Sequence, residues 1–346
     1  MAGRPACRPL RAGAVVSQVV TTTGPADADR FGFVLPHEHV LINELREDRA
    51  DGLLNDVGIM EDELRRVAGL GASLLVELTT GELTVGAASD PRGLYRHRQV
   101  GDSTATPTRT ASNATELAAL AEGSGVGMIL GTGHYRDPYL TGPDIDGLGV
   151  VGLAERMIAD LTEGFDGTRI RAGVIGEVGA DKWYVSAREE RSIRAAARAH
   201  MATGATISTH TSKWPVGGDV LALLRAEGVA PDRVIIGHCS TIDISEYHMA
   251  MAEAGAYVQF DTLRGGPGFV MDRAVRHIMA LVSAGYLERI LLSHDVCLRS
   301  HLAMFGGCGY RYIHDSFLPQ LRAAGLNDGE LDALVRANPL RALAAY

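Results

Sequence analysis

The residues with the clearest capacity for chemistry are His37 and His39, which lie two positions apart at the end of the apolar run FVLPHEH. In an extended chain, side chains at positions i and i+2 point to the same side, so the two imidazoles converge on one point. Imidazole nitrogens bind zinc and neighbouring transition metals. An isolated pair could equally be two unrelated histidines, so the interpretation depends on the rest of the chain.

Three further candidate ligands each end a separate apolar run. His210 ends ATISTH, His238 ends VIIGH and Asp295 ends ILLSHD. Any one of them could be an ordinary hydrogen-bonded residue at the end of a strand. The carboxyl ends of parallel barrel strands meet at one face, however, and these three residues together with the histidine pair favour a metal centre there.

The elements that would position these residues follow a regular rhythm. Short apolar runs alternate with stretches rich in Ala, Leu and Arg whose apolar positions have helical period. The expected strands are Phe33–Pro36, Ser73–Thr79, Gly127–Thr132, Ile170–Glu177, Thr206–His210, Arg233–His238, Ala256–Phe260 and Arg289–Asp295. The expected helices are Glu61–Leu70, Glu116–Glu122, Leu153–Thr162, Ala187–Thr203, Gly218–Glu227, Ile244–Glu253, Arg273–Ala284 and Asp328–Arg336. A last helix is predicted to have Asn338 as its N-cap and Pro339 as its first residue.

This alternation predicts an α/β fold, a single-domain (β/α)8 (TIM) barrel over residues 17–346, with residues 1–16 as a flexible tail. The segment Gly81–Asn113 is long and rich in Gly, Ser and Thr, and it follows the second strand. Segments of that length are typical of lids, binding loops or disorder. Its position after a strand would place it on the face where barrel enzymes bind their substrates.

Composition limits the classes of partner. The chain has 33 basic and 42 acidic residues, a net charge of -9, which argues against nucleic acid or an anionic membrane surface. No apolar stretch approaches the roughly 18 residues that span a bilayer. The four cysteines form no CxxC pair, and we expect a reducing, cytoplasmic setting. Nucleotide, dinucleotide and serine-hydrolase motifs (GxxxxGK[ST], GxGxxG after the first strand, GxSxG) are absent from the sequence.

The ordered set of motifs resembles the phosphotriesterase family of the amidohydrolase superfamily over residues 17–346. The motifs are LPHEHV (35–40), GTGHYRD (131–137), AGVIGEVG (172–179), STHT (208–211), IGHCS (236–240), LLSHD (291–295) and NPLRAL (338–343). The resemblance implies two divalent metal ions. One would be held by His37, His39 and Asp295, and the other by His210 and His238, with a bridging water.

The chain departs from phosphotriesterase itself at the residue that bridges the two metals. In that enzyme a carboxylated lysine ends the fourth strand, whereas this strand reads IGEVG and the nearby Lys182 lies further along the loop. The branch called phosphotriesterase homology proteins is similar in placing a glutamate here, so the bridge is assigned to Glu177. A second departure is the Gly81–Asn113 segment, which is longer than the family's usual connection.

The chemistry expected of such a centre is hydrolysis. Two metals lower the pKa of a bridging water and polarise the electrophile's oxygen. Asp295 can accept the proton of the attacking water and pass it to the leaving group. Zinc is the expected metal, and the ligand types also suit manganese, cobalt or iron.

Three further residues are predicted to bind the substrate. Arg264 and Arg299 follow the seventh and eighth strands, where many barrels hold an anionic group. Tyr135 follows the third strand and could donate a hydrogen bond to a substrate oxygen. Two neighbours of the ligands, His294 and Cys239, are expected to face away from the metals.

The leading hypothesis is a binuclear metal-dependent hydrolase of a small ester, lactone or amide, with an anionic group on the substrate. Phosphotriester or organophosphate hydrolysis is the alternative within the same chemistry. A non-catalytic metal-binding barrel and a metal-dependent lyase or isomerase are alternatives of another class. The resemblance also suggests a homodimer, and the expected partner is a small-molecule substrate.

Overall fold

A computed structural model of the 346-residue chain describes residues 18–49, 51–71, 73–84, 108–141 and 143–345. The predicted tail and most of the Gly81–Asn113 segment lie outside the described residues. Of that segment, the structure describes a short 3-10 helix over Gly81–Leu83 and the start of the helix that follows it.

Eight parallel strands form the sheet at the centre of the molecule. They are β3 (Phe33–Glu38), β6 (Ser73–Glu77), β7 (Gly127–Thr132), β8 (Val174–Gly179), β9 (Ile207–His210), β10 (Val234–Ile236), β11 (Tyr257–Phe260) and β12 (Ile290–Leu292). Each strand pairs with its neighbours along the chain, in the order β3, β6, β7, β8, β9, β10, β11, β12. The first and last strands approach each other where His37 N donates to Ser293 Oγ at 3.0 Å and Asp295 N donates to His37 O at 3.2 Å. The sheet is therefore a (β/α)8 barrel, as the sequence predicts.

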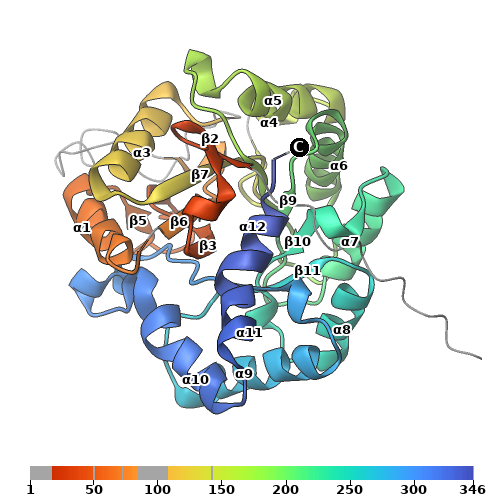
Figure 1. Ribbon diagram of the computed structural model, residues 1–346. Coiled ribbons are helices and arrows are strands. Elements are labelled where there is room, and N and C mark those ends of the chain that lie inside the picture. Colours follow the sequence, from red (N-terminus) through yellow and green to blue (C-terminus); the bar gives the residue numbers. More distant parts are fainter. Residues whose placement is uncertain (1–17, 50, 72, 85–107, 142, 346) are drawn as a thin grey trace, which may run out of the picture.

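Helices surround the barrel (Figure 1). They are α1 (Val57–Ala68), α3 (Ala111–Ser124), α4 (Pro143–Asp146), α5 (Val150–Thr162), α6 (Ala187–Thr203), α7 (Gly217–Ala226), α8 (Ser245–Glu253), α9 (Gly268–Ser283), α10 (Leu318–Ala323), α11 (Asp328–Asp332) and α12 (Asn338–Ala342). Among the described residues, no helix has both the length and the apolar character needed to cross a bilayer.

Alternate residues of the strands pack into different parts of the core. In β6, Leu75 lies in the cluster formed with the surrounding helices, which includes Leu64 of α1. Its neighbours Leu74 and Val76 lie in another cluster, which contains Leu340 of α12. This alternation is what a strand buried on both faces requires. Figure 1 shows α11 and α12 lying across one end of the barrel.

The predicted elements are confirmed, with shifted boundaries. The fourth strand begins at Val174 rather than Ile170, and α9 begins earlier than predicted, at Gly268. Two short antiparallel pairs were not predicted from the sequence: β1 (Gln18–Thr21) with β2 (Gly24–Asp27), and β4 (Ile42–Asn43) with β5 (Leu53–Leu54).

The predicted N-cap role of Asn338 is wrong. Asn338 has helical backbone angles and continues from a π-helical turn, Ala333–Ala337. Its side-chain amide donates to Leu287 O at 2.8 Å and to Ile290 O at 3.0 Å instead of capping a helix. The residue therefore fastens the C-terminal helices to the start of β12.

Candidate metal centre

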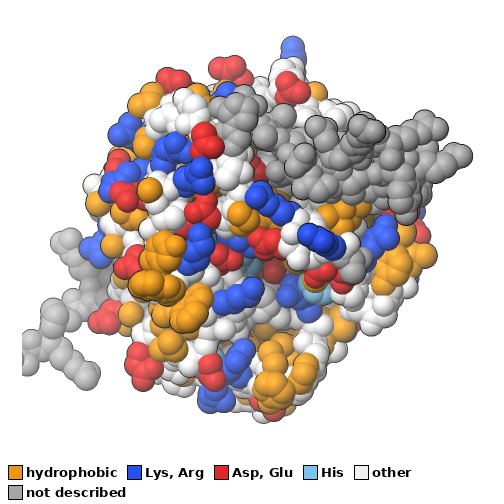
Figure 2. All heavy atoms as spheres, turned by 180° about the vertical axis from the view of Figure 1, so that it is seen from behind, with side chains coloured by type: hydrophobic (Ala, Val, Ile, Leu, Met, Phe, Trp, Pro, Cys, Tyr) orange, Lys and Arg blue, Asp and Glu red, His pale blue; other side chains and the backbone are white. Residues whose placement is uncertain are grey.

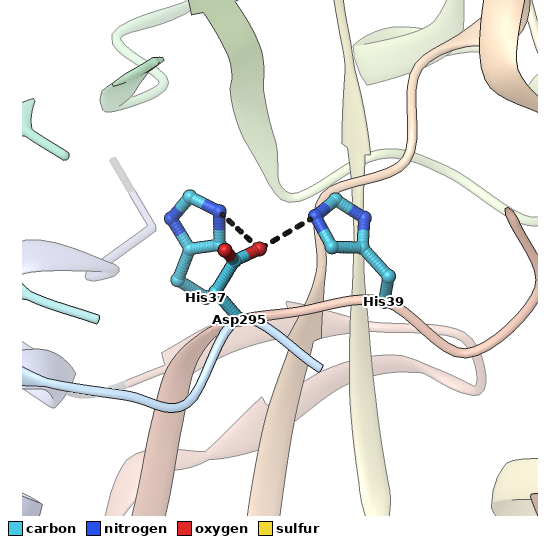
Figure 3. A group of neighbouring side chains, drawn as sticks. All are labelled: His37, His39 and Asp295. Atoms are coloured by element: carbon cyan, nitrogen blue, oxygen red, sulfur yellow. Dashed lines mark ion pairs between the residues drawn. The ribbon is translucent and has the colours of Figure 1, made fainter. Parts of the chain in front are cut away.

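The first group of candidate ligands joins the first and last strands of the barrel. His37 lies in β3, His39 lies just after it, and Asp295 follows β12. The Nε2 atoms of His37 and His39 lie 3.8 and 3.4 Å from Asp295 Oδ1 (Figure 3). The two imidazoles therefore converge on one carboxylate, as their spacing of two residues predicts.

The second group comes from the opposite side of the barrel. Glu177 lies in β8, His210 ends β9 and His238 follows β10. Glu177 Oε2 lies 3.1 Å from His210 Nδ1 and 3.0 Å from His238 Nε2, and these two nitrogens are 2.8 Å apart. The same Oε2 lies 3.1 Å from His37 Nε2. Glu177 thus contacts both groups.

The geometry of these atoms fits divalent cations. Two atoms bonded to one zinc-sized ion at about 2.0–2.1 Å lie roughly 3 Å apart, close to the separations within each group. His37 Nε2 is buried and, among the described residues, has no hydrogen-bond partner, although Glu177 Oε2 is only 3.1 Å away. A buried polar atom without a partner is costly, and a cation between the nitrogen and the carboxylate would remove that cost. Imidazole and carboxylate donors together suit zinc and its neighbours.

Opposite charges dominate the site. Burial alone would raise the pKa of Glu177, but His37 and His210 hold it well below its usual range. Burial would lower the pKa of His238, yet Asp261 and Glu177 raise it to about 10. The pKa of Asp295 is also lowered, because His39 and Arg264 outweigh its burial. The buried carboxylates are thus stabilised by positive charge nearby. Bound cations would supply such charge.

Two ligand residues have a left-handed backbone. His238 and Asp295 both have φ near 56°, a conformation that residues other than glycine adopt at a cost. The His238 amide donates to Asp261 Oδ2 at 2.8 Å, and the Asp295 amide donates to His37 O. These hydrogen bonds hold both side chains at the mouth of the barrel, beyond the regular ends of β10 and β12.

Three ligand imidazoles contact oxygen atoms through Nδ1, the ring nitrogen on the side away from the proposed cations. Asp261 Oδ1 lies 3.0 Å from His238 Nδ1, and its Oδ2 lies 3.2 Å from His37 Nδ1. Thr79 Oγ1 lies 2.9 Å from His39 Nδ1. An imidazole that donates through Nδ1 keeps its Nε2 lone pair for a metal. All three Nε2 atoms belong to the candidate ligand groups.

Two of the predicted substrate-binding residues lie beside the ligands. Tyr135 is buried, and its hydroxyl lies 3.2 Å from His210 Nδ1. Arg264 follows β11, and its Nη1 contacts the backbone oxygen of Asp295 and lies 3.1 Å from Asp295 Oδ2. The Arg264 side chain is 25% exposed, so part of its guanidinium remains accessible.

The third, Arg299, contacts other residues. Its Nε donates to Leu53 O at 3.2 Å, and its guanidinium lies over the ring of Phe305. A role for Arg299 in substrate binding stays a prediction. His294 and Cys239 face away from the ligands, as expected: His294 Nδ1 contacts Glu38 Oε1 at 2.9 Å, and Cys239 is fully buried in the core.

Several residues of the site were missed by the sequence analysis. Asp261 directly follows β11, and a carboxylate at that position was a recognisable sign. Gln259 accepts from His37 Nδ1 at 3.1 Å, and Glu77 accepts from Thr79, but no sequence pattern marks either residue. Glu44 is a further carboxyl near the ligands that is partly buried, and its loss of solvation raises its pKa to about 7.

The site faces the surface opposite to α11 and α12. Figure 2 shows that surface, with histidine side chains near its centre among Lys, Arg, Asp and Glu side chains. An arrangement of two ligand groups, one shared carboxylate and an accessible arginine can bind cations and position a polar substrate beside them.

Comparison with known proteins gives consistent matches. The model of the phosphotriesterase family matches residues 97–343. The phosphotriesterase homology protein of Escherichia coli is 32% identical over 312 residues, which cover 90% of this chain and 97% of that protein. Its crystal structure with phosphate in the active site superimposes with a TM-score of 0.79 and 31% identity, covering 91% of this chain and 99% of that one. The N-acetyltaurine hydrolase of Rattus norvegicus is 26% identical over 347 residues, covering 93% of this chain and 96% of that protein.

Proposed function

This chain belongs to the phosphotriesterase family and is a metal-dependent hydrolase, and from that premise we propose that it uses two divalent cations to hydrolyse a small ester, lactone or amide that carries an anionic group. The observation that carries the binuclear assignment is the position of Glu177. Its Oε2 lies within 3.1 Å of His37 Nε2 in one ligand group and of His210 and His238 in the other. A single cation would leave one of these groups without a partner.

The residues that would hold the cations are His37, His39 and Asp295 on one side and His210 and His238 on the other, with Glu177 shared. When bound, two such cations lower the pKa of a water between them and polarise the oxygen of the scissile group. Zinc is the metal we expect, and the ligand types also accept manganese, cobalt or iron.

Asp295 is the proposed proton carrier. Its Oδ1 faces His37 and His39, whereas its Oδ2 lies beside Arg264 and is therefore the oxygen left to take a proton from the attacking water. Asp295 would then pass the captured proton on to the leaving group.

The proposed substrate class rests on Arg264 and on the named relatives. Arg264 is a partly exposed cation beside Asp295, and a guanidinium suits a carboxylate, phosphate or sulfonate group. N-acetyltaurine, the substrate in the relative's name, is an amide with a sulfonate group, and the Escherichia coli structure holds phosphate in its active site. Tyr135 is proposed to donate to a substrate oxygen near His210.

The test is a substrate panel with and without metal. The protein is treated with a chelator, reconstituted with zinc or manganese, and assayed on N-acyl amides, lactones and carboxylic esters, each as an anionic and a neutral pair, and on an aryl phosphotriester. We expect metal-dependent turnover of an anionic acyl substrate, lost in Glu177→Gln and kept in Glu163→Gln, an exposed control on the surface. Turnover of the phosphotriester alone would instead favour organophosphate hydrolysis. Metal binding without turnover of any substrate would contradict the proposal.

A further inference from the structure

Two networks of buried polar residues contact the candidate ligands on the side away from the proposed cations, and they differ in the number of ligands that they contact. We propose that Asp261 is a positioning residue for both cation positions, whereas a chain of Thr79, Glu77 and Arg109 positions the ligand of only one. The inference rests on the binuclear centre proposed above. It assigns separate roles to buried residues that make no contact with the substrate.

Asp261 joins ligands that belong to different cations. Its Oδ2 lies 3.2 Å from Nδ1 of His37, and its Oδ1 lies 3.0 Å from Nδ1 of His238. Oδ2 also accepts the backbone amide of His238 at 2.8 Å, in the left-handed turn described above. Asp261 is fully buried, so water cannot replace these contacts. One carboxylate therefore contacts one imidazole of each ligand group, and at His37 it shares Nδ1 with Gln259 Oε1, 3.1 Å away.

The second network ends on one ligand. Thr79 Oγ1 donates to Glu77 Oε1 at 2.6 Å, so the hydroxyl proton is not available to form a hydrogen bond with His39. The hydroxyl oxygen can then only accept from His39 Nδ1, 2.9 Å away. This arrangement fixes the tautomer of His39, with the Nε2 lone pair directed towards Asp295.

Glu77 is in turn held by Arg109. The Arg109 side chain is 1% exposed and Glu77 is fully buried, and the two form an ion pair. Arg109 Nη2 also donates to Glu77 O, Nε to Gly131 O and Nη1 to Asn113 Oδ1. A buried ion pair is costly to desolvate and is weak evidence for stability by itself. Here Arg109 contacts Glu77 Oε2, and Glu77 Oε1 faces the Thr79 hydroxyl.

The two networks therefore predict different losses of metal. Removing a partner that orients a metal-bound imidazole typically costs roughly 10- to 100-fold in metal affinity. Loss of the Thr79 hydroxyl weakens only the cation held by His37, His39 and Asp295. Loss of the Asp261 carboxylate weakens both cations, because His238 loses the acceptor of its Nδ1 and His37 keeps only Gln259 Oε1, 3.1 Å from its Nδ1.

The experiment compares metal binding by the full-length metal-free protein in Thr79→Val and Asp261→Asn. Titration with manganese in a calorimeter gives the number of manganese sites and their affinities. Electron paramagnetic resonance distinguishes a coupled pair of manganese ions from a single ion. Thr79→Ser keeps the hydroxyl and is the matched control. The melting temperature of each metal-free variant shows whether it folds. If Thr79→Val does not fold, Thr79→Ala is used in its place, and Asp261→Ala likewise takes the place of Asp261→Asn.

We expect two strong sites in the wild type and in Thr79→Ser. Thr79→Val keeps one strong site, with an uncoupled manganese signal at one equivalent, whereas both affinities fall in Asp261→Asn. Equal losses at both sites in Thr79→Val, or a loss at a single site in Asp261→Asn, would overturn the inference while the binuclear centre stands. Fewer than two sites in the wild type would overturn the proposed function and this inference with it.

Discussion

At the residue scale, Glu177 is the side chain on which the proposed chemistry depends most. It is the carboxylate within 3.1 Å of imidazoles from both ligand groups. Replacing it with glutamine keeps the size of the side chain and removes the charge that two cations would share. We expect Glu177→Gln to bind at most one equivalent of metal and to lose at least 100-fold in kcat. Elemental analysis and steady-state kinetics measure both quantities, and two equivalents bound with full activity would refute the bridging role.

Arg264 decides whether the substrate carries a negative charge. Because its guanidinium also contacts Asp295, Arg264→Met should lower kcat on every substrate. The informative quantity is the ratio of kcat/KM between an anionic substrate and its neutral analogue. We expect this ratio to fall at least tenfold, about 1.4 kcal/mol of lost recognition. An unchanged ratio would remove the anion-binding role, and the same measurement on Arg299→Met decides whether the second arginine takes part.

The positions of the six candidate ligands could be read from the sequence because each lies near or just beyond the carboxyl end of a strand, and the ends of parallel strands converge. Glu177 needed a family resemblance as well, since a single acid in IGEVG has no distinctive spacing. Asp261, Thr79 and Glu77 were missed because they act through hydrogen bonds to the far sides of imidazoles. Those contacts depend on how neighbouring strands lie in space, which composition and periodicity do not encode.

At the scale of elements, the eight strands and the helices around them followed from local pattern, because apolar runs and helical periodicity reflect burial directly. Boundaries were less accurate: two strands were predicted to run to His238 and Asp295, whose backbone is left-handed, whereas β10 and β12 end at Ile236 and Leu292. The hairpin of β1 and β2 has only four residues in each strand and includes Gly24 and Pro25, so it carried no alternating pattern. Asn338 resembled an N-cap, but its amide satisfies backbone oxygens near β12 instead.

The packing of α5 against the barrel makes stability depend on pH. Asp160 of α5 is buried, and its Oδ2 accepts from Thr132 at 2.6 Å and Thr108 at 2.5 Å. Burial raises the pKa of Asp160 from 3.8 to about 6. The native state thus binds this proton more tightly than the unfolded state, so the stabilisation is complete below pH 3.8 and is lost as the pH rises through 6.

Asp160→Asn cannot ionise and should remove this dependence. Between pH 4 and pH 7, we expect the free energy of unfolding of the wild type to fall by up to about 3 kcal/mol more than that of Asp160→Asn. Urea unfolding of the metal-free protein at several pH values measures the difference. Asp62→Asn, at a side chain that is 74% exposed, is the matched control and should follow the wild type. Parallel pH profiles for Asp160→Asn and the wild type would contradict the assignment.

At the scale of the whole molecule, the ligands come from β3, β8, β9 and the residues after β10 and β12, so bound metal ties distant parts of the barrel together. Ions that bind only the native state stabilise it by mass action. Two sites at a free metal concentration 1,000-fold above their dissociation constants add roughly 8 kcal/mol. For a chain of this length we expect the melting temperature to rise by roughly 10 °C over that of the chelated protein. A smaller rise in Glu177→Gln would support the assignment, and equal melting temperatures with and without metal would contradict it.

The most direct test of the binuclear centre is a crystal structure of the metal-loaded protein, with anomalous diffraction recorded on both sides of the metal's absorption edge. We predict two anomalous peaks at the mouth of the barrel. One should lie about 2.0–2.3 Å from His37 Nε2, His39 Nε2 and an oxygen of Asp295, the other at similar distances from His210 and His238, with one Glu177 oxygen bonded to each. A single peak, or none, in crystals grown with excess metal would contradict the account.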